Sequence, residues 1–379
     1  MIISLFKTNT LKKAFLFNKV LLILFIVYFC IPKVGLASID KFEIRVLDIV
    51  SILISLIVLS KIRLKGENVI YLSCFIILQI IVGYYYSNIL SLLYLFRFFQ
   101  YLLLGYGFYL LMMSSYRLNF LYTFFIIQVP ICIMQYLRFI PNYDPGRGIL
   151  YSSEFTGTFG TPAELAYFLI ALVAIFMNLG FIRHLTFSLF TILNGVAFAS
   201  MLMVITGLKR LIALLPRLVI IFFPYFILLS MVLVFIDLNE IKNLISDPGF
   251  DTSYLSKGQS FNINNFDGPA TLLMRSVKFI DTIIYMLNNF AVLLFGCGYG
   301  CGYGAMDSGI VRLVLEFGVL FTILVFFLSR KISKYLLFVL ISINFLFDGF
   351  WSSHVAPLLF AGIFMSLAAG KSYKQESLN

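Results

Sequence analysis

Arginine and aspartate side chains interrupt an otherwise apolar sequence at positions suited to phosphate and hydroxyl chemistry. Arg147 stands between two glycines, Arg210 follows the end of a long apolar run, and Arg275 lies within a helical pattern. A guanidinium group offers a fork of donors that matches phosphate oxygens. Asp307 follows a glycine-rich run, where it could act as a general base for a hydroxyl group or cap the next helix.

The composition predicts an all-α polytopic integral membrane protein rather than a soluble fold. The chain is 61% hydrophobic and 12% charged, whereas soluble domains are roughly a quarter charged. Apolar stretches of about twenty residues recur, and each can cross a hydrocarbon core of about 30 Å as a helix. We expect 10 to 12 transmembrane helices in a single membrane domain, residues 1–379. The predicted spans are 17–33, 44–60, 69–87, 89–113, 119–139, 162–181, 185–206, 218–236, 310–328, 334–347 and 354–370.

The net charge of +11 is explained by topology. Basic residues gather in the short connections, which the positive-inside rule places in the cytoplasm together with both termini. The sequence has no basic stripe with interleaved aromatic residues, which is the pattern that would indicate nucleic-acid binding. The segments 140–161 (the first outer loop), 237–309 (the large outer loop) and 348–353 then lie outside. We expect 162–181 and 185–206 to form a returning pair, while the number of crossings between 185 and 236 stays open. Gly35-Leu36-Ala37 imitates a signal-peptide cleavage site, but an uncleaved first helix is the plainer interpretation.

Some polar residues fall where lipid would not tolerate them. Arg97 lies in the middle of a predicted span with Gln100 one turn further on, so it must face a protein interior or a wet cavity. It could bind an anionic head group there or tie two helices together. Asp348 and His354 flank the last outer turn around Trp351, which is typical of an interfacial anchor. We expect His354 to be satisfied locally rather than to be catalytic.

The first outer loop is predicted to be irregular. Its prolines and glycines oppose regular structure and hold Arg147 on a turn. Thr161, Pro162 and Glu164 form a helix start, which makes Glu164 a capping residue rather than a general base. Lys209 and Arg210 fall on the outer side in this topology, against the positive-inside trend. Either they have an anionic partner outside, or the orientation is wrong and they are ordinary cytoplasmic charges.

The large outer loop contains seven acidic and four basic residues and a predicted interfacial helix near 270–294. Apolar residues recur there at intervals of three and four, and the other face carries Arg275, Lys278, Thr282 and Tyr285. The two bases would meet lipid head groups or a substrate phosphate. The glycine run 296–304 supplies backbone freedom beside a large ligand rather than a nucleotide fingerprint. Its two cysteines lack the further ligands that a zinc site needs.

These patches resemble the O-antigen polymerases (Wzy type) and, more distantly, the O-antigen ligases, which are polytopic proteins with a large outer loop late in the chain. The likeness extends over about residues 95 to 370 in short motifs. Where ligase-like relatives carry a histidine before a span, this chain has Asp307, which fits a polymerase better. In chain order the motifs are Phe155-Thr-Gly-Thr-Phe-Gly-Thr-Pro-Ala-Glu-Leu-Ala166, Thr206-Gly-Leu-Lys-Arg210, Arg275, Leu294-Phe-Gly-Cys-Gly298, and Asp307-Ser308 followed by Glu316-Phe-Gly318.

The resemblance implies a glycosyltransferase of lipopolysaccharide or capsule biosynthesis, with its active site on the periplasmic face of a bacterial inner membrane. A glycan on undecaprenyl pyrophosphate would be the donor and a lipid-linked repeat unit the acceptor, with membrane lipids and a chain-length regulator protein as further partners. No acidic metal-binding motif is visible, so we expect no cofactor, and arginines would stabilise the leaving pyrophosphate. The candidate catalytic residues are Arg147, Arg210, Arg275 and Asp307, and the candidate substrate-binding residues are Arg97, Lys209, Lys278 and Tyr285.

Other classes of membrane protein remain alternatives. An O-antigen ligase would share the architecture and the lipid-linked donor. A transporter or flippase of lipid-linked oligosaccharides is expected to show internal repeats and broken helices at the midplane, and we find no repeat. A scaffold without chemistry would leave Arg97 and the outer arginines unexplained.

Overall fold

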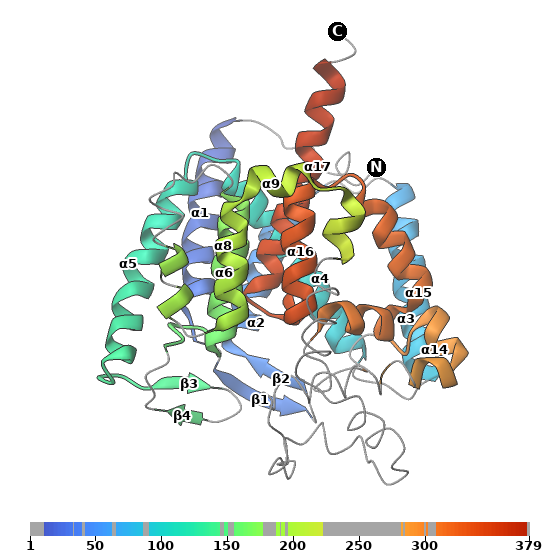
Figure 1. Cartoon of the computed structure of the whole chain (residues 1–379), viewed down its shortest axis with the longest axis horizontal. Helices are drawn as coiled ribbons and strands as arrows, with labels where there is room; N and C mark the ends of the chain where they lie inside the picture. Colours follow the sequence, from blue (N-terminus) through green and yellow to red (C-terminus); the bar gives the residue numbers. More distant parts are fainter. Residues whose placement is uncertain are drawn as a thin grey trace.

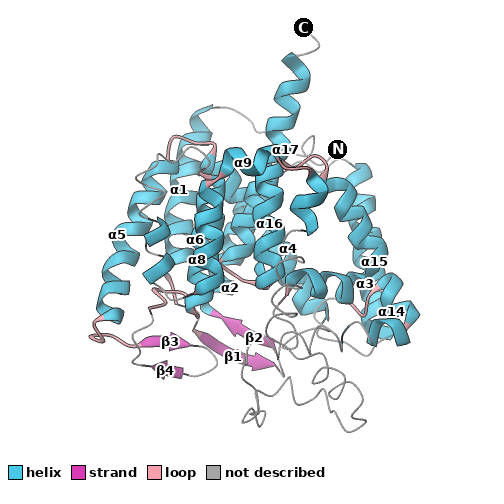
Figure 2. Ribbon diagram, in the orientation of Figure 1, coloured by secondary structure: helices cyan, strands magenta, loops and turns pink. Residues whose placement is uncertain are grey.

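The chain forms a mostly helical bundle with two small hairpins at one end (Figure 2). The computed structural model describes residues 11–32, 34–39, 42–62, 66–85, 91–144, 148–150, 155–176, 187–189, 191–193, 196–222, 282, 285–298, 301 and 308–376. The helices are α1 (Leu11–Cys30), α2 (Val46–Leu59), α3 (Gly66–Tyr85), α4 (Ser91–Met112), α5 (Arg117–Tyr136), α6 (Pro162–Ile175), α8 (Ala197–Gly207), α9 (Lys209–Leu214), α14 (Phe290–Phe295), α15 (Gly309–Ser329), α16 (Lys334–Leu346) and α17 (Val355–Glu376), with a 3-10 turn, η2 (Gly349–Trp351).

Two antiparallel hairpins mark one end of the bundle, which we call the hairpin end. Strand β1 (Gly35–Ile39) pairs with β2 (Phe42–Arg45), and β3 (Asn142–Asp144) pairs with β4 (Gly148–Leu150). The start of α1 and the end of α17 lie at the opposite end, which we call the terminal end (Figure 1). The prediction that the first outer loop has no regular structure is therefore wrong. Pro141 directly precedes β3 and Gly148 begins β4, so both are accommodated at strand ends rather than preventing pairing.

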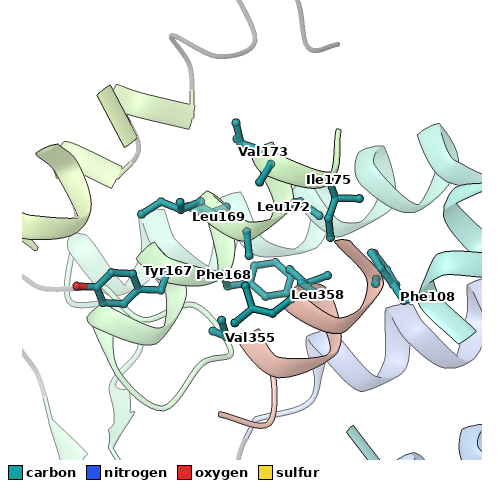
Figure 3. Packing of buried hydrophobic residues seen from close by; sticks show 14 of the residues in the cluster. Phe108, Tyr167, Phe168, Leu169, Leu172, Val173, Ile175, Val355 and Leu358 are labelled. Atoms are coloured by element: carbon teal, nitrogen blue, oxygen red, sulfur yellow. The ribbon is translucent and has the colours of Figure 1, made fainter. Parts of the chain in front are cut away.

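Helix α4 is central, and two glycines let its neighbours approach on opposite faces. At Gly105 an added Cβ would overlap the Cβ of Phe360, and at Gly107 it would lie 2.8 Å from Val58. The first glycine faces α17 and the second faces α2. Around them Phe108 of α4, Phe168 of α6 and Leu358 of α17 are fully buried in the main core (Figure 3).

The predicted spans match most of the described helices, but two of the spans and the predicted interfacial helix are interrupted. Residues 185–206 are not one helix, because Val196 is extended and α8 begins after it. Helix α15 follows the prediction closely, yet Gly318 breaks it with a φ of 79° and a ψ of 168°. The predicted interfacial helix near 270–294 is also interrupted, since Asn289 leaves helical geometry before α14.

Helices α6 and α8 run in the same direction, toward the terminal end. Tyr167, early in α6, stacks on Phe347 near the hairpin end, whereas Ile175 lies against Gly362 of α17 further up the bundle. Thr206, late in α8, hydrogen-bonds with Tyr335 in the first turn of α16. The expected returning pair 162–181 and 185–206 is therefore wrong.

Helix α9 lies at the terminal end (Figure 1). Lys334 donates from Nζ to the carbonyl of Ala213 within α9 over 3.1 Å, and Arg217, just after α9, donates to the carbonyl of Ser329 over 3.1 Å. The backbone of Lys209 and Arg210 is thereby placed at the end opposite the β3–β4 hairpin that flanks Arg147. The prediction that these two bases lie at the outer face with Arg147 is wrong. Their position agrees with ordinary positive-inside charges.

Two described helices are long and apolar enough to cross a membrane on length and composition alone, Leu92–Met112 and Arg117–Tyr136. Six shorter apolar helices accompany them: Leu16–Cys30, Val46–Leu59, Ser73–Tyr85, Pro162–Ile175, Lys334–Phe345 and Val355–Ala368. These lengths are consistent with a membrane protein.

The close contact between α4 and α17 predicts a cost for any side chain at Gly105. We expect Gly105→Ala to destabilise the protein by about 1–3 kcal/mol, because the new methyl group overlaps Phe360 and lies 3.0 Å from the carbonyl oxygen of Pro357. Thermal unfolding in detergent measures this as a lower midpoint. Gly207→Ala, at an exposed helix end, is the matched control. Equal midpoints for the two variants would contradict the close packing.

Candidate functional site

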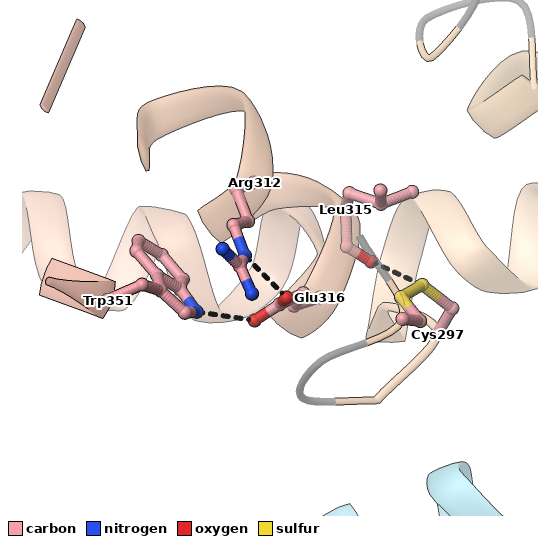
Figure 4. The surroundings of a disulfide bond; sticks show 6 residues. Cys297, Arg312, Leu315, Glu316 and Trp351 are labelled. Atoms are coloured by element: carbon pink, nitrogen blue, oxygen red, sulfur yellow. Dashed lines mark hydrogen bonds and ion pairs between the residues drawn. A yellow bond between two sulfur atoms is a disulfide. The ribbon is translucent and has the colours of Figure 1, made fainter. Parts of the chain in front are cut away.

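A cluster of charges surrounds the tryptophan at the hairpin end. Arg312 of α15 donates from Nε to Oε1 of Glu316 over 2.8 Å and from Nη1 to Oδ2 of Asp348 over 2.9 Å. Trp351 donates from Nε1 to Oε2 of Glu316 over 2.9 Å, and its ring centre lies 4.9 Å from the guanidinium carbon (Figure 4). We call these four residues the Arg312 cluster.

Local structure explains how the cluster is positioned. Arg312 and Glu316 are one helical turn apart, which places them on the same face of α15. The turn η2 is fixed because the backbone N–H of Phe350 donates to the side-chain carbonyl of Asn344 over 3.1 Å. Asp348 and Trp351, at the two ends of this turn, are thus directed at α15.

The beginning of the glycine run is bound to the same part of α15. The N–H groups of Cys297 and Gly298 donate to the carbonyls of Leu315 and Glu316 over 2.9 and 3.1 Å. Gly296 has a φ of +80°, and a Cβ there would overlap the carbonyl of Glu316. The glycine run was expected to give the backbone freedom beside a large ligand. At Gly296 that freedom instead allows close packing against the protein's own helix α15. Cys297 forms a disulfide with Cys301, which the sequence reasoning did not predict.

A second polar cluster, which we call the Glu164 cluster, lies on the other side of residues 348–354. Ser352 donates from Oγ to Oε1 of Glu164, and Nδ1 of His354 lies 3.3 Å from the same oxygen. All three residues are buried. The predicted cap is confirmed, because the hydroxyl of Thr161 accepts from the N–H of Glu164 over 3.1 Å. The carboxylate, however, binds the start of α17, which the sequence reasoning missed.

The segment before α6 is inserted among the helices rather than exposed. Gln128 of α5 accepts from the N–H of Thr158 over 3.1 Å, and Gln135 accepts from the N–H of Gly157 over 2.7 Å. The hydroxyl of Thr158 donates to the carbonyl of Phe29 over 2.9 Å. The second half of the predicted first outer loop is therefore part of the core and positions Glu164.

Arg97 is tied to another helix. It donates from Nη2 to Oδ2 of Asp48 over 2.6 Å, and the N–H of Arg45 donates to the same oxygen over 2.9 Å. Arg97 is buried, so its partner compensates a charge that would be costly alone. Of the two roles expected for Arg97, the structure shows the tie between two helices. Its partner is a carboxylate of α2 rather than backbone carbonyls.

The other predicted site residues are only partly placed. Arg147, Arg275, Lys278 and Asp307 lie outside the described residues. Tyr285 is 44% exposed in a short helical stretch before α14. Lys209 and Arg210 are at the terminal end, as described above. None of the four predicted catalytic residues is thus shown near the Arg312 cluster.

The functional candidates that the sequence reasoning missed had a readable signal. Arg312 and Glu316 are charges four residues apart inside a predicted span, and such charges mark functional or interhelical contacts. Asp348 and Trp351 were noted only as flanks of a turn. Their partnership with α15 depends on tertiary packing.

The Arg312 cluster combines a compensated cation with a carboxylate that reaches the surface. The side chains of Arg312, Glu316 and Asp348 are 5%, 0% and 21% exposed. Oδ1 of Asp348 is itself buried, whereas Oδ2 binds Arg312 and can accept a further hydrogen bond. Among the described residues, no three His, Cys, Asp or Glu side chains are arranged as metal ligands. No protein-family model matches the chain, and no curated protein or solved structure is significantly similar to it.

Removing one member of the Arg312 cluster should cost more than removing an ion pair. We expect Glu316→Leu to lower stability by about 3–5 kcal/mol, because it leaves the buried Arg312 undercompensated. Arg312→Met with Glu316→Leu should lose less, since the remaining Asp348 is partly hydrated. Thermal unfolding of both variants measures the difference.

The control for this experiment is Lys331→Met, which removes an exposed charge at the terminal end and should change stability by less than about 0.5 kcal/mol. A double variant at least as unstable as Glu316→Leu would contradict the expectation that an unpaired Arg312 is the main cost of that substitution.

Proposed function

We propose that this protein is a polytopic glycosyltransferase of a bacterial inner membrane that polymerises lipid-linked oligosaccharide repeat units for a surface polysaccharide. The growing glycan is transferred from undecaprenyl pyrophosphate to a new lipid-linked repeat unit at the periplasmic face. The hairpin end is the periplasmic end in this proposal.

The outward faces of the helices support a membrane location. Large apolar side chains remain exposed on α2, α3 and α5, including Leu56 at 59%, Ile81 at 59% and Ile126 at 72%. Water-soluble proteins rarely leave extended apolar surfaces open, whereas lipid chains would cover them. The disulfide near the start of α15 favours an oxidising compartment on that side.

One observation carries the proposal: two of the motifs that resemble the polymerases contact residues 348–354, and a third binds the backbone of one of these two. The motif at 155–166 supplies Glu164 to Ser352 and His354. The motif at 316–318 supplies Glu316 to Trp351, and the motif at 294–298 binds the backbone beside it. Segments remote in sequence thus meet at one end of the bundle, as a shared site requires.

The reaction needs a nucleophile, a base and a cation. The hydroxyl oxygen of the acceptor sugar forms a bond to the anomeric carbon of the donor, and the bond from that carbon to the pyrophosphate oxygen breaks. The hydroxyl proton passes to a carboxylate, for which Asp307 remains the candidate, and undecaprenyl pyrophosphate leaves with the electron pair. Arg147 and Arg275 remain candidates for stabilising its charge. Arg210, at the opposite end, does not.

Deletion of the gene should leave surface glycan that carries a single repeat unit, because attachment continues without polymerisation. Gel electrophoresis of the purified polysaccharide shows this directly, and the intact gene on a plasmid should restore long chains. Loss of all attached glycan would indicate a ligase, and repeat units trapped in the cytoplasm would indicate a flippase. Either result would exclude the polymerase.

Replacement of the loop arginines tests the assignment of the cations. We expect Arg147→Ala and Arg275→Ala each to lower polymerisation by about 100-fold, since each removes positive charge from the leaving group. Chain-length distribution in complemented cells, with expression confirmed, is the readout. Arg330→Ala removes an exposed charge at the terminal end and serves as the control. Unaltered chain lengths in both loop variants would refute the assignment.

A further inference from the structure

We propose that the Arg312 cluster is a glycan-binding subsite, in which Trp351 and Asp348 hold an uncharged or amino sugar of the substrate and not its pyrophosphate. The identification of this sugar as part of a lipid-linked repeat unit rests on the proposed function. The recognition chemistry itself follows from the contacts of the cluster.

The charge of the cluster excludes it as the pyrophosphate site. One guanidinium group is paired with two carboxylates over 2.8 and 2.9 Å, so the net charge is −1. The side of Arg312 that does not face these carboxylates is not open either, because the ring of Trp351 lies over the guanidinium carbon. A pyrophosphate would meet net negative charge, whereas sugar hydroxyls or an ammonium group would be attracted.

The parts of the cluster that reach the surface suit a sugar. Arg312 and Glu316 are buried, but the side chain of Asp348 is 21% exposed and Trp351 is half-buried. Because Oδ1 of Asp348 is buried, a sugar hydroxyl would donate to Oδ2, which accepts from Arg312 and has capacity for a second hydrogen bond. An indole ring presents a negative π face to the weakly positive C–H edges of a pyranose. Together they recognise both the polar and the apolar side of a sugar ring.

The cluster is also rigid before any ligand arrives. Glu316 fixes the indole through Nε1, Arg312 fixes the carboxylate of Asp348, and Asn344 holds the backbone between them. Side chains that are already ordered lose little entropy on binding, which favours recognition of a weakly held, hydrated ligand such as a sugar. The carbonyl of Glu316 also binds Gly298, near the beginning of the glycine run, so the site borders the large loop.

Trp351 is the only tryptophan of the chain, so intrinsic fluorescence of the full-length protein reports on this site. The purified protein in nanodiscs is titrated with oligosaccharide released by mild acid from the cell's own lipid-linked repeat units, and separately with inorganic pyrophosphate. We expect a saturable change in emission with the oligosaccharide and none with pyrophosphate. Asp348→Asn should weaken the apparent affinity by about tenfold, and Glu376→Gln, the same change in the last turn of α17, should not.

Each other outcome overturns the proposal. Pyrophosphate that changes the emission and competes with the oligosaccharide would make the cluster an anion site. Oligosaccharide that leaves the emission unchanged, or that binds Asp348→Asn as tightly as the unaltered protein, would remove the glycan subsite even if polymerisation is confirmed. Conversely, a deletion strain with normal chain lengths would refute the polymerase while the fluorescence result still stood. Thermal unfolding of Asp348→Asn verifies that the variant is folded.

Discussion

The buried carboxylate of Glu316 is the interaction on which the hairpin end depends. A charge in an apolar bundle is tolerated only with donors around it, and here Arg312 and Trp351 supply them. The backbone carbonyl of the same residue accepts from Gly298. One residue therefore holds together the first part of α15, the turn η2 and the beginning of the glycine run. This close approach requires Gly296 and Gly318, both with positive φ, because side chains there would overlap the opposite backbone.

The same physical solution recurs twice nearby. Asp48 joins α2 to α4 through Arg97, and Glu164 joins α6 to the start of α17 through Ser352 and His354. Close packing already resists sliding of the helices, and a buried carboxylate restricts their register further because it has few acceptable positions. These pairs thus set the register of the bundle. All three lie toward the hairpin end of the bundle.

Helix positions were predictable where a local cause exists. Pro162 with its Thr161 cap starts α6, and the predicted span 334–347 closely matches α16 because its apolar run is bounded by Lys334 and a polar turn. Hydropathy could not show that Val196 is extended, because an apolar residue raises the mean hydropathy of a segment equally in a helical or an extended conformation. Spacing alone reveals the pair Arg312–Glu316. It cannot reveal Asp348 as their partner, since 36 residues separate it from Arg312. Lys209 was misplaced because the number of membrane crossings before it was not determined. One crossing more or fewer moves a base to the opposite side.

The pairing of the buried arginines with carboxylates limits which residues can stabilise the leaving pyrophosphate in the proposed reaction. Arg97 and Arg312 are the two deeply buried arginines of the described residues, and both are bound to carboxylates. Neither arginine can leave its ion pair to bind a pyrophosphate without leaving a buried carboxylate uncompensated. Under the proposed function, charge stabilisation must therefore come from the loop arginines, while the preformed cluster orients the sugar. If the Arg312 cluster holds the sugar and the loop supplies the cations, the cations become effective only when the glycan is already bound. This order would protect the donor from attack by water.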